Sequence, residues 1–557
     1  MIKLEHGQKL IRIGSPVKNL DSGNFNNNKN SYINLIKSLQ LELDKIKECG
    51  GQLAVEKQHS KGKMTVRERI NYLIDDGSKF LELGLFAAFD MYKDVGSIPA
   101  AGVIIGIGKI NGSLTVIVGN DATVKAGAYF EISLKKTLRA QQISLENNIP
   151  IIYLVDSAGV FLPLQDQVFP DENHFGKIFY NNARMSALGI NQIAVVMGPC
   201  VAGGAYLPVM CDKYVIVEGS NMFLAGPALV KAAIGQDIDK ETLGGAKTHS
   251  SISGTSDYHA KDDISALNMT RDIINHTNLP SARLFDRVKS DPPHFEINDI
   301  IGYINSEKPE EYDILEIISR IVDRSEFLEF KSNYGKTIVC GNAKIGGYNV
   351  GIIANQRKIQ KTELGELQMG GVIYSDSADK AARFVMNCNQ DSIPIIFMHD
   401  VNGFMIGKDA EWGGIAKNGA KLVNTVSNSV VPKITLIIGG SYGAGNYAMS
   451  GRSYNPRFVY AWPTAKIAVM GGAQAAKTLL QIKLSKMGKI EDSKKHQLYD
   501  KIKKQFEKQQ DIKYGAARMW VDEIIMPHQT RDILIKSLNI VNHQTKIPEP
   551  KFGVLQV

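Results

Sequence analysis

Short apolar runs alternate along this chain with longer segments in which apolar residues return every three or four positions. Four runs have the length and the β-branched composition of buried strands: 103–110, 114–118, 151–155 and 193–197. Apolar residues at Leu134, Leu138 and Ile143 predict a helix between these runs, and the segment around 177–188 predicts another. Strands that alternate with helices indicate an α/β fold, in which helices cover the faces of a mainly parallel sheet.

The amino-terminal part of the chain has a different character. Residues 1–30 are polar, end in Asn26-Asn27-Asn28 and predict a loose arm, and a helix is expected to follow over about 31–48. Another helix is predicted to start at Thr65, because Thr65 and Glu68 have the spacing of a capping box ahead of apolar residues.

The same pattern of strands and turns occurs twice. The segment 150–159 recurs at 394–403, 244 residues later; 192–206 recurs at 433–447 and 109–112 recurs at 344–347, with offsets of 241 and 235. Offsets that drift slowly while keeping their order indicate two related domains. A stretch from 277 to 312 interrupts the pattern with Pro280, Pro292, Pro293 and Pro309. We therefore expect an arm over 1–30, domains over 31–285 and 313–557, and a linker over 286–312.

Length and composition agree with two domains and exclude several classes of protein. A chain of 557 residues, with 44% hydrophobic and 22% charged residues, exceeds one ordinary core. The net charge is +8, but the densest basic run, 483–504, also carries acidic residues and predicts a solvated helix rather than a nucleic-acid surface. No segment has the apolar length of a membrane span or a signal peptide, which predicts a cytoplasmic protein. The five cysteines and eleven histidines show no metal-ligand spacing, so no metal site is predicted.

Two glycine-rich turns are the main candidates for chemistry. Gly203-Gly204 and Gly443-Ala444-Gly445 each follow a short apolar strand and precede a predicted helix. At such a turn the amide N–H groups have no partner within the helix, and glycine lets a ligand approach the backbone. Each turn could hold a developing oxyanion, at about 3 to 4 kcal/mol per donor. The competing interpretation, that the glycines only permit tight packing, is weakened because the turn recurs in both domains.

Two further patterns have alternative interpretations. Gly439-Gly440-Ser441-Tyr442-Gly443 has the form of a nucleophile elbow, with Asp522 and His528 downstream in the order of a serine hydrolase. The repeat pairs Ser441 with Cys200, however, so the domains share a backbone shape and not a hydroxyl. Asp156 and Asp400 follow equivalent strands and could act as acids or bases, but capping of a neighbouring turn is the favoured role.

Several longer segments resemble one enzyme family. Residues 161–181, 195–206, 223–227 and 437–447 are similar to the carboxyltransferase (β) subunits of biotin-dependent acyl-CoA carboxylases, most closely the methylcrotonoyl-CoA type. The resemblance covers roughly residues 55–545. It implies two tandem domains of the ClpP/crotonase superfamily and transfer of a carboxyl group from carboxybiotin to an acyl-CoA.

This chemistry explains why two turns are needed. Loss of CO2 from carboxybiotin leaves negative charge on the ureido oxygen, and deprotonation of the acyl-CoA leaves an enolate on the thioester oxygen. By resemblance, the amides around Gly203 and Gly204 hold the enolate, and those around Gly443, Ala444 and Gly445 hold the biotin. The biotin nitrogen exposed by CO2 loss can take the substrate proton, so no side-chain base is required.

The resemblance also implies contacts for both ligands. The expected acyl-CoA contacts are Lys125, Ala126, Gly127, Ala128, Ser157, Ala158, Gly159 and Ala205, with Phe161 and Leu162 as an apolar wall for the acyl group. The expected biotin contacts are Gly403, Phe404, Asn446 and Tyr447.

Motifs that are missing from the sequence imply a partner. There is no Ala-Met-Lys-Met biotinylation site and no ATP-binding glycine loop, so biotin and its carboxylation are expected from a biotin carboxylase/carrier α subunit. The family further implies a β hexamer within a larger assembly, with active sites formed between the first domain of one protomer and the second domain of another. Residues 356–371 are longer than the methylcrotonoyl pattern, a change that bears on partner contacts more than on the acyl group.

Several functions remain open at this point. Propionyl-CoA, acetyl-CoA and geranyl-CoA are alternative substrates to 3-methylcrotonoyl-CoA. Within the same chemistry, a biotin-dependent decarboxylase subunit of a membrane sodium pump is another option. Outside this chemistry, the alternatives are a serine hydrolase that uses Ser441 and a non-catalytic assembly scaffold.

Overall fold

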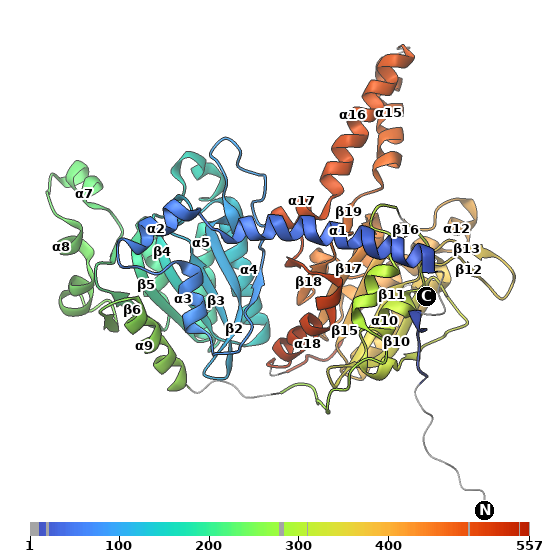
Figure 1. The fold of residues 1–557 in the computed structure, drawn as a ribbon, viewed down its shortest axis with the longest axis horizontal. Helices are drawn as coiled ribbons and strands as arrows, with labels where there is room; N and C mark the ends of the chain where they lie inside the picture. Colours follow the sequence, from blue (N-terminus) through green and yellow to red (C-terminus); the bar gives the residue numbers. More distant parts are fainter. Residues whose placement is uncertain are drawn as a thin grey trace, which may run out of the picture.

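The chain folds into two halves, each built around one eight-stranded sheet (Figure 1). The computed structural model describes residues 11–17, 22–277, 283–308, 310–487, 491–544 and 546–555. The strand order is β1-β2-β3-β4-β5-β6-β8 in the first sheet and β9-β10-β11-β15-β17-β18-β20 in the second, and β7 and β19 pair with β5 and β17. In each sheet the first three strands are antiparallel and the rest are parallel. The predicted mainly parallel α/β architecture and its duplication are therefore confirmed.

The strands of the first sheet are β1 (Leu81–Leu83), β2 (Val103–Ile110), β3 (Ser113–Asn120), β4 (Ile151–Ser157), β5 (Gln192–Val201), β6 (Lys213–Val217), β7 (Asn221–Phe223) and β8 (Tyr258–Ala260). Those of the second are β9 (Leu328–Glu329), β10 (Ile338–Ile345), β11 (Tyr348–Asn355), β15 (Ile395–Val401), β17 (Lys433–Tyr442), β18 (Phe458–Ala461), β19 (Lys466–Ala468) and β20 (Glu523–Ile524). Four short strands pair outside the sheets: β12 (Gln360–Lys361) with β13 (Leu367–Gln368), and β14 (Val372–Ile373) with β16 (Gly403–Phe404).

The helices of the first half are α1 (Ser22–Lys47), α2 (Gln52–His59), α3 (Val66–Leu73), α4 (Glu131–Asn147), α5 (Phe175–Ala187), α6 (Tyr206–Val209), α7 (Pro227–Ile234), α8 (Lys240–Gly244) and α9 (Asp263–Asn275). Those of the second half are α10 (Ile314–Ser319), α11 (Ser375–Gln390), α12 (Lys408–Trp412), α13 (Ile415–Ser427), α14 (Gly443–Ala448), α15 (Gly472–Met487), α16 (Asp492–Gln510), α17 (Ile512–Ala517) and α18 (Thr530–Val541).

Local signals in the sequence account for many of these elements. The capping box predicted at Thr65 is present, since its side chain accepts from the Glu68 amide and the Glu68 carboxylate accepts from the Thr65 amide. The expected helices around 134–143 and 177–188 are α4 and α5. The central strands β4 and β15 are buried along almost their whole length, because helices cover both faces of each sheet.

Helix α1 begins nine residues earlier than predicted. It starts at Ser22 rather than near 31, and so includes the asparagine run that predicted a loose arm. Contacts with the 3-10 turn Ile297–Gly302 override the poor helix propensity of asparagine. The Phe25 ring packs edge-on against Tyr303 at 5.4 Å, and the Asn28 side-chain amide donates to the Gly302 carbonyl.

The carboxyl-terminal part of the chain contacts the first half directly. The Asp522 carbonyl accepts from the Gly84 amide at 2.7 Å, and the Ala517 carbonyl accepts from the Ala88 amide at 2.9 Å. Met519 belongs to the same apolar cluster as Phe130 and other residues of the first half. Residues 517–523 therefore complete the packing of the first half.

Helix α1 and the hairpin of α15 and α16 are the most extended features of the molecule. Helix α1 runs across both halves, and the hairpin projects from the second half (Figure 1). The lysines of the basic run 483–504 whose side chains are described lie on this hairpin and are largely exposed, as expected for a solvated helix face. In the described part of the chain, no helix combines the length and the apolar character required to cross a bilayer.

Candidate functional site

The first glycine turn lies where the chain leaves β5. Residues Ala202–Ala205 form a 3-10 turn that leads into α6. A Cβ added to Gly203 or Gly204 would stand 4.0 Å from its nearest neighbour, the Phe175 ring. Gly203 is exposed and Gly204 is half-exposed, so the turn faces open space and a ligand can approach its backbone.

Three loops meet at this turn. The Ala158 amide donates to the Ala126 carbonyl at 3.0 Å, and the Ser157 hydroxyl donates to the Gly127 carbonyl at 2.7 Å. Ser157 is also paired in register with Cys200 of β5. The structure therefore brings the predicted acyl-CoA segments 125–128 and 157–159 together beside Gly204, at the carboxyl ends of β3, β4 and β5.

The remaining acyl-CoA candidates differ in their surroundings. Phe161 is half-buried and stacks on Phe130, with ring centroids 4.6 Å apart. Leu162 is 73% exposed, and it does not line the small cavity beside Gly204. Ala205 is buried beneath the turn, so its side chain faces the interior.

The second glycine turn has the same backbone conformation as the first. Gly443 has a φ of +53°, and the equivalent residue 241 positions earlier, Ala202, has a φ of +55°. Ala444 is exposed at the start of α14, whereas a Cβ on Gly445 would stand 2.6 Å from the Val401 side chain. Both halves therefore place the first turn of a helix toward solvent, in the same left-handed bend.

The predicted biotin contacts surround this second turn. A Cβ on Gly445 would lie 3.2 Å from the Cα of Gly403, so β16, which also contains Phe404, runs close to α14. Gly403 has a φ of +128°, and no atom lies within 4 Å of where its Cβ would stand. Tyr447 is 47% exposed, while the Asn446 side-chain amide points inward and donates to the Ser441 hydroxyl at 2.8 Å.

A buried network behind this turn excludes the nucleophile elbow. Ser441 is fully buried, and its hydroxyl lies 2.9 Å from Nδ1 of His399, whose Nε2 donates to the Met449 carbonyl. Burial lowers the pKa of His399 to about 4, against a raising effect of the Met449 hydrogen bond, so the ring is neutral at pH 7. Asp522, the proposed acid of a hydrolase, instead accepts hydrogen bonds from Arg139, Arg452 and the Val459 amide. Ser441 therefore holds α14 in place and is not a nucleophile.

Asp156 and Asp400, which occupy equivalent positions in the two halves, differ in the contacts of their carboxylates. The Asp400 carboxylate accepts from the Gly440 amide at 2.7 Å, so it caps the second turn as expected. Asp156 instead forms a buried ion pair with Arg69, with 2.9 Å between Nη1 and Oδ2. Burial raises the pKa of Asp156, and Arg69 opposes this effect. The capping role predicted for both aspartates is therefore right only for Asp400.

Charged residues near the turns were missed by sequence reasoning. Arg69 bridges Asp156 and Asp263, and Nζ of Lys63 donates to the Met197 carbonyl at 2.7 Å. In the second half, Arg357 lies 3.3 Å from Asp400, beside the Gly440 backbone. These partners come from segments far apart in the chain, so no spacing in the sequence signals them.

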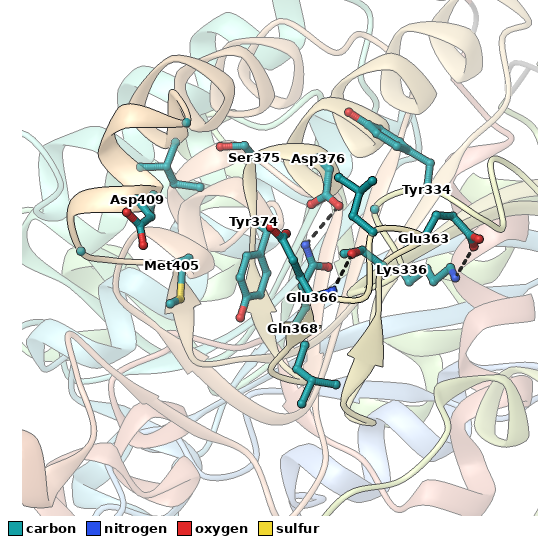
Figure 2. A pocket seen from close by; sticks show the side chains of 18 of the residues that line it. Tyr334, Lys336, Glu363, Glu366, Gln368, Tyr374, Ser375, Asp376, Met405 and Asp409 are labelled. Atoms are coloured by element: carbon teal, nitrogen blue, oxygen red, sulfur yellow. Dashed lines mark hydrogen bonds and ion pairs between the residues drawn. The ribbon is translucent and has the colours of Figure 1, made fainter.

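Residues 356–371 form a short hairpin that lines a separate cavity. The turn between β12 and β13, together with β13 itself, forms one wall of a space of about 670 Å³ (Figure 2). The Gln368 side chain donates to Asp376 at 3.2 Å, and Lys336 pairs with Glu363 at 3.0 Å (Figure 2). Met405, which directly follows β16, lies on the opposite side of the cavity (Figure 2). The hairpin therefore lies on the second-domain side, next to the expected biotin contacts.

The charged side chains that the structure describes do not form a metal centre. Within the described ranges, no group of three or more histidine, cysteine, aspartate or glutamate side chains is arranged to hold a metal ion. Among residues 203–204 and 443–445 of the two glycine turns, Gly203 and Ala444 are the exposed ones.

Comparison with known proteins gives one consistent result. Residues 57–555 match the model of the carboxyl transferase domain family. The chain is 46% identical over 538 residues to the mitochondrial methylcrotonoyl-CoA carboxylase beta chain of Dictyostelium discoideum, covering 95% of this chain and 89% of that one. It is 45% identical over 514 residues to the biotin-dependent 3-methylcrotonyl-coenzyme A carboxylase beta1 subunit of Mycobacterium tuberculosis, covering 91% and 94%.

A solved structure extends this similarity to the fold. The beta subunit of P. aeruginosa geranyl-CoA carboxylase matches with a TM-score of 0.86 and 33% identity, over 98% of this chain and 100% of that one. The match includes both halves, so the tandem crotonase-like architecture is confirmed. The chain therefore belongs to the carboxyl transferase family, as a relative of the β subunits of biotin-dependent acyl-CoA carboxylases.

Proposed function

We propose that this protein transfers a carboxyl group from carboxybiotin to 3-methylcrotonoyl-CoA. The observation that carries the proposal is the pair of equivalent turns at Gly203-Gly204 and Ala444-Gly445, 241 residues apart, in which Gly203 and Ala444 are exposed. One turn serves each reactant, and the substrate is proposed from the relatives that act on this acyl-CoA.

In this proposal the first turn stabilises the enolate. The amides of Gly203 and Gly204 donate to the thioester oxygen, and segments 125–128 and 157–159 position the rest of the acyl-CoA. Phe161, stacked on Phe130, provides a fixed apolar wall for the branched acyl group. Donors that are held in place before the reaction stabilise developing charge without a cost of reorganisation.

The second turn is the proposed site for the biotin ring, because part of it is open to a ligand. Gly403 is open, Ala444 is exposed, and the carboxylate of Asp400 caps the backbone at Gly440. Biotin brings the carboxyl group to this site on a partner chain. The amides of Gly443, Ala444 and Gly445 donate to its ureido oxygen, and Phe404 and Tyr447 line the approach.

The assembly belongs to the same proposal. The partner is a biotin carboxylase/carrier α subunit, and β subunits form a hexameric core in which the active site takes one domain from each of two protomers. The domains extend over 31–285 and 313–557 with a linker over 286–312, and each of these domains contains one complete sheet. The hairpin at 360–368 lies on the biotin side, where it would affect partner contacts more than acyl choice.

An acyl-CoA panel tests the function. The chain is purified with its natural α subunit and assayed with ATP, bicarbonate and 3-methylcrotonoyl-, geranyl-, propionyl- or acetyl-CoA. We expect the highest kcat/KM with 3-methylcrotonoyl-CoA. Preference for another acyl-CoA would replace the substrate but keep the chemistry, whereas no carboxylation of any of them would reject the function.

The cellular compartment needs its own measurement. We propose a cytoplasmic location, although some relatives, such as that of Dictyostelium discoideum, carry the word mitochondrial in their names. If the source cell has mitochondria, cell fractionation followed by immunodetection of the chain decides between the cytoplasm and the mitochondrion.

A further inference from the structure

Another cavity, away from the glycine turns, lies between the two halves. It has a volume of about 630 Å³ and is lined by the β2–β3 hairpin of the first half and by α18 and Tyr348 of the second. The turn of this hairpin precedes β3, whereas the glycine turns follow the carboxyl ends of their strands. The cavity thus lies at the amino-terminal end of the parallel strands, whereas the proposed catalytic site lies at their carboxyl end.

The titratable side chains of lysine, arginine and histidine dominate the polar lining of this cavity. Six basic side chains line it: Lys79, Lys109, Arg283, Arg287, Lys536 and His543. No aspartate or glutamate is among its described lining residues. Among the carboxylates outside the lining, Asp532 attracts Lys536, and Asp75 is bonded to Arg271 and to the amides of Asn111 and Gly112.

The basic residues repel one another across the cavity. Burial, and then the charge of Lys79, lower the pKa of Lys536. Burial also lowers the pKa of His543, followed by the charges of Arg283 and Lys109. Like charges held close together destabilise the protein unless an anion compensates them.

The wall that carries these charges is held by hydrogen bonds. The Arg287 guanidinium donates to the Gly346 carbonyl and to the Asn539 side chain, and lies 5.1 Å from the Tyr348 ring centroid. The Leu284 amide donates to the Asn542 carbonyl, and the Phe285 amide donates to the Asn542 side chain. The segment 284–287 is therefore fixed against α18, and the arginine is oriented before any ligand binds.

The remaining lining indicates the size and type of the ligand. Ile107, Leu114 and Ile540 provide an apolar surface beside the charges. A Cβ on Gly77 or Gly112 would meet no atom within 4 Å, so the backbone there can be approached closely. The volume lies within the range of about 300–1,000 Å³ that is usual for small-molecule sites.

We propose that this cavity binds a small organic polyphosphate, whose phosphates contact Lys79, Lys536 and Arg287 and whose organic group contacts the apolar surface. Arginine and lysine are the usual ligands of phosphate groups. Because Lys79 belongs to the first half and Lys536 to the second, the ligand would join the two halves.

Binding of inorganic tripolyphosphate to the full-length protein tests the charge requirement. Isothermal titration at low ionic strength compares the wild type with the double variant Lys79→Gln/Lys536→Gln. The matched control is Lys501→Gln/Lys504→Gln, which removes two exposed lysines from α16. We expect one site per chain in the wild type and the control, and at least tenfold weaker binding in the cavity variant.

The source of the phosphates is distinguished by separate titrations with ADP, ATP and coenzyme A. Tighter binding of one of these than of tripolyphosphate, lost in the cavity variant, identifies the organic group. Coenzyme A bound at the catalytic site would be retained by that variant, so failure of this proposal is separable from failure of the proposed function.

The melting temperature without ligand gives an independent check. The cavity variant should melt at the wild-type temperature or above it, because two repelling charges are removed. Absence of wild-type binding, equal binding by the cavity and control variants, or a lower melting temperature of the cavity variant would each overturn the proposal. Displacement of tripolyphosphate only by acidic peptides would likewise replace the small ligand with a protein partner.

Discussion

The two glycine turns begin with equivalent backbone bends, but the residue at the bend is alanine in the first turn and glycine in the second. Ala202 and Gly443 have nearly the same positive φ, but only glycine adopts this conformation without strain. A non-glycine residue in such a region costs about 1–3 kcal/mol and persists where the surrounding structure imposes it. At Ala202 the strain is located directly before Gly203 and Gly204, the donors proposed for the enolate.

The role of the Gly204 amide can be tested by removing it. Gly204→Pro deletes the N–H donor, so carboxylation should fall by about 100-fold or more, while partial reactions on the biotin side remain measurable. The measurement is kcat for the acyl-CoA together with the biotin-side partial reaction.

Gly204→Ala is the matched control for this variant. Its Cβ would meet the Phe175 ring at 4.0 Å, an ordinary contact, and the amide is retained. The alanine variant should keep kcat within a few-fold of the wild type. Unchanged turnover in the proline variant would rule out the assignment of this donor.

His399 gives a prediction for acid stability. With a folded pKa of about 4 against about 6.5 in the unfolded chain, only the unfolded state takes up the proton between these values. Stability is unaffected above pH 6.5 and falls as the pH drops to 4, by about 3 kcal/mol in total.

Melting temperatures between pH 4 and 8 test this prediction. His399→Asn should show a shallower loss on acidification than the wild type, whereas His496→Asn, on the exposed face of α16, should keep the wild-type slope. Equal slopes for wild type and His399→Asn would contradict the burial argument.

The sequence predicted some site residues and not others for a physical reason. The glycine turns are continuous segments, and their repetition 241 residues apart is visible without a structure. Arg69 and Arg357 act on Asp156 and Asp400 from other segments of the chain, and such contacts depend on the folded arrangement. The role of Ser441 was ambiguous because the sequence motif around it does not reveal whether the hydroxyl is buried.

At the scale of elements, long and strongly apolar segments were predicted and short ones were not. The buried strands β4 and β5 match the expected runs at 151–155 and 193–197. Strands β9 and β20, of two residues each, carry no periodicity that a sequence could show. The start of α1 depends on contacts with residues near 300, which local propensity cannot include.

Those contacts predict the effect of removing the Phe25 ring. Phe25 is 6% exposed, and Phe25→Ala should cost a few kcal/mol locally, because a buried ring leaves a cavity. The first turns of α1 should then fray. The rate of cleavage within residues 22–30 in limited proteolysis measures this effect. Leu41→Ala, at a position 66% exposed on the same helix, is the control and should not change cleavage.

At the scale of the whole molecule, a buried ion pair joins the two halves. Arg139 of α4 contacts Asp522 at 2.8 Å, and both side chains are almost fully buried. Burial acts to raise the pKa of Asp522, but Arg139 and Arg452 outweigh it and hold this pKa well below its usual range. The charges therefore persist inside the junction.

Removing one member of this pair should destabilise the protein strongly. Arg139→Leu leaves Asp522 without its main partner, and such a loss costs about 3–5 kcal/mol. The melting temperature should fall by several degrees. Lys231→Leu breaks the exposed pair with Asp237 and should leave the melting temperature nearly unchanged, and equal effects of the two variants would show that the junction pair is unimportant.

The packing of residues 517–523 against the first half also constrains how the protein is made. Residues 517–523 are synthesised more than 400 residues after Gly84 and Ala88, whose amides they accept hydrogen bonds from. Met519 of this segment also completes the apolar cluster that contains Phe130. While the ribosome is still translating, an apolar surface of the nascent first half has no cover. A nascent chain that ends before residue 517 would therefore expose this apolar surface to chaperones and to other unfolded chains.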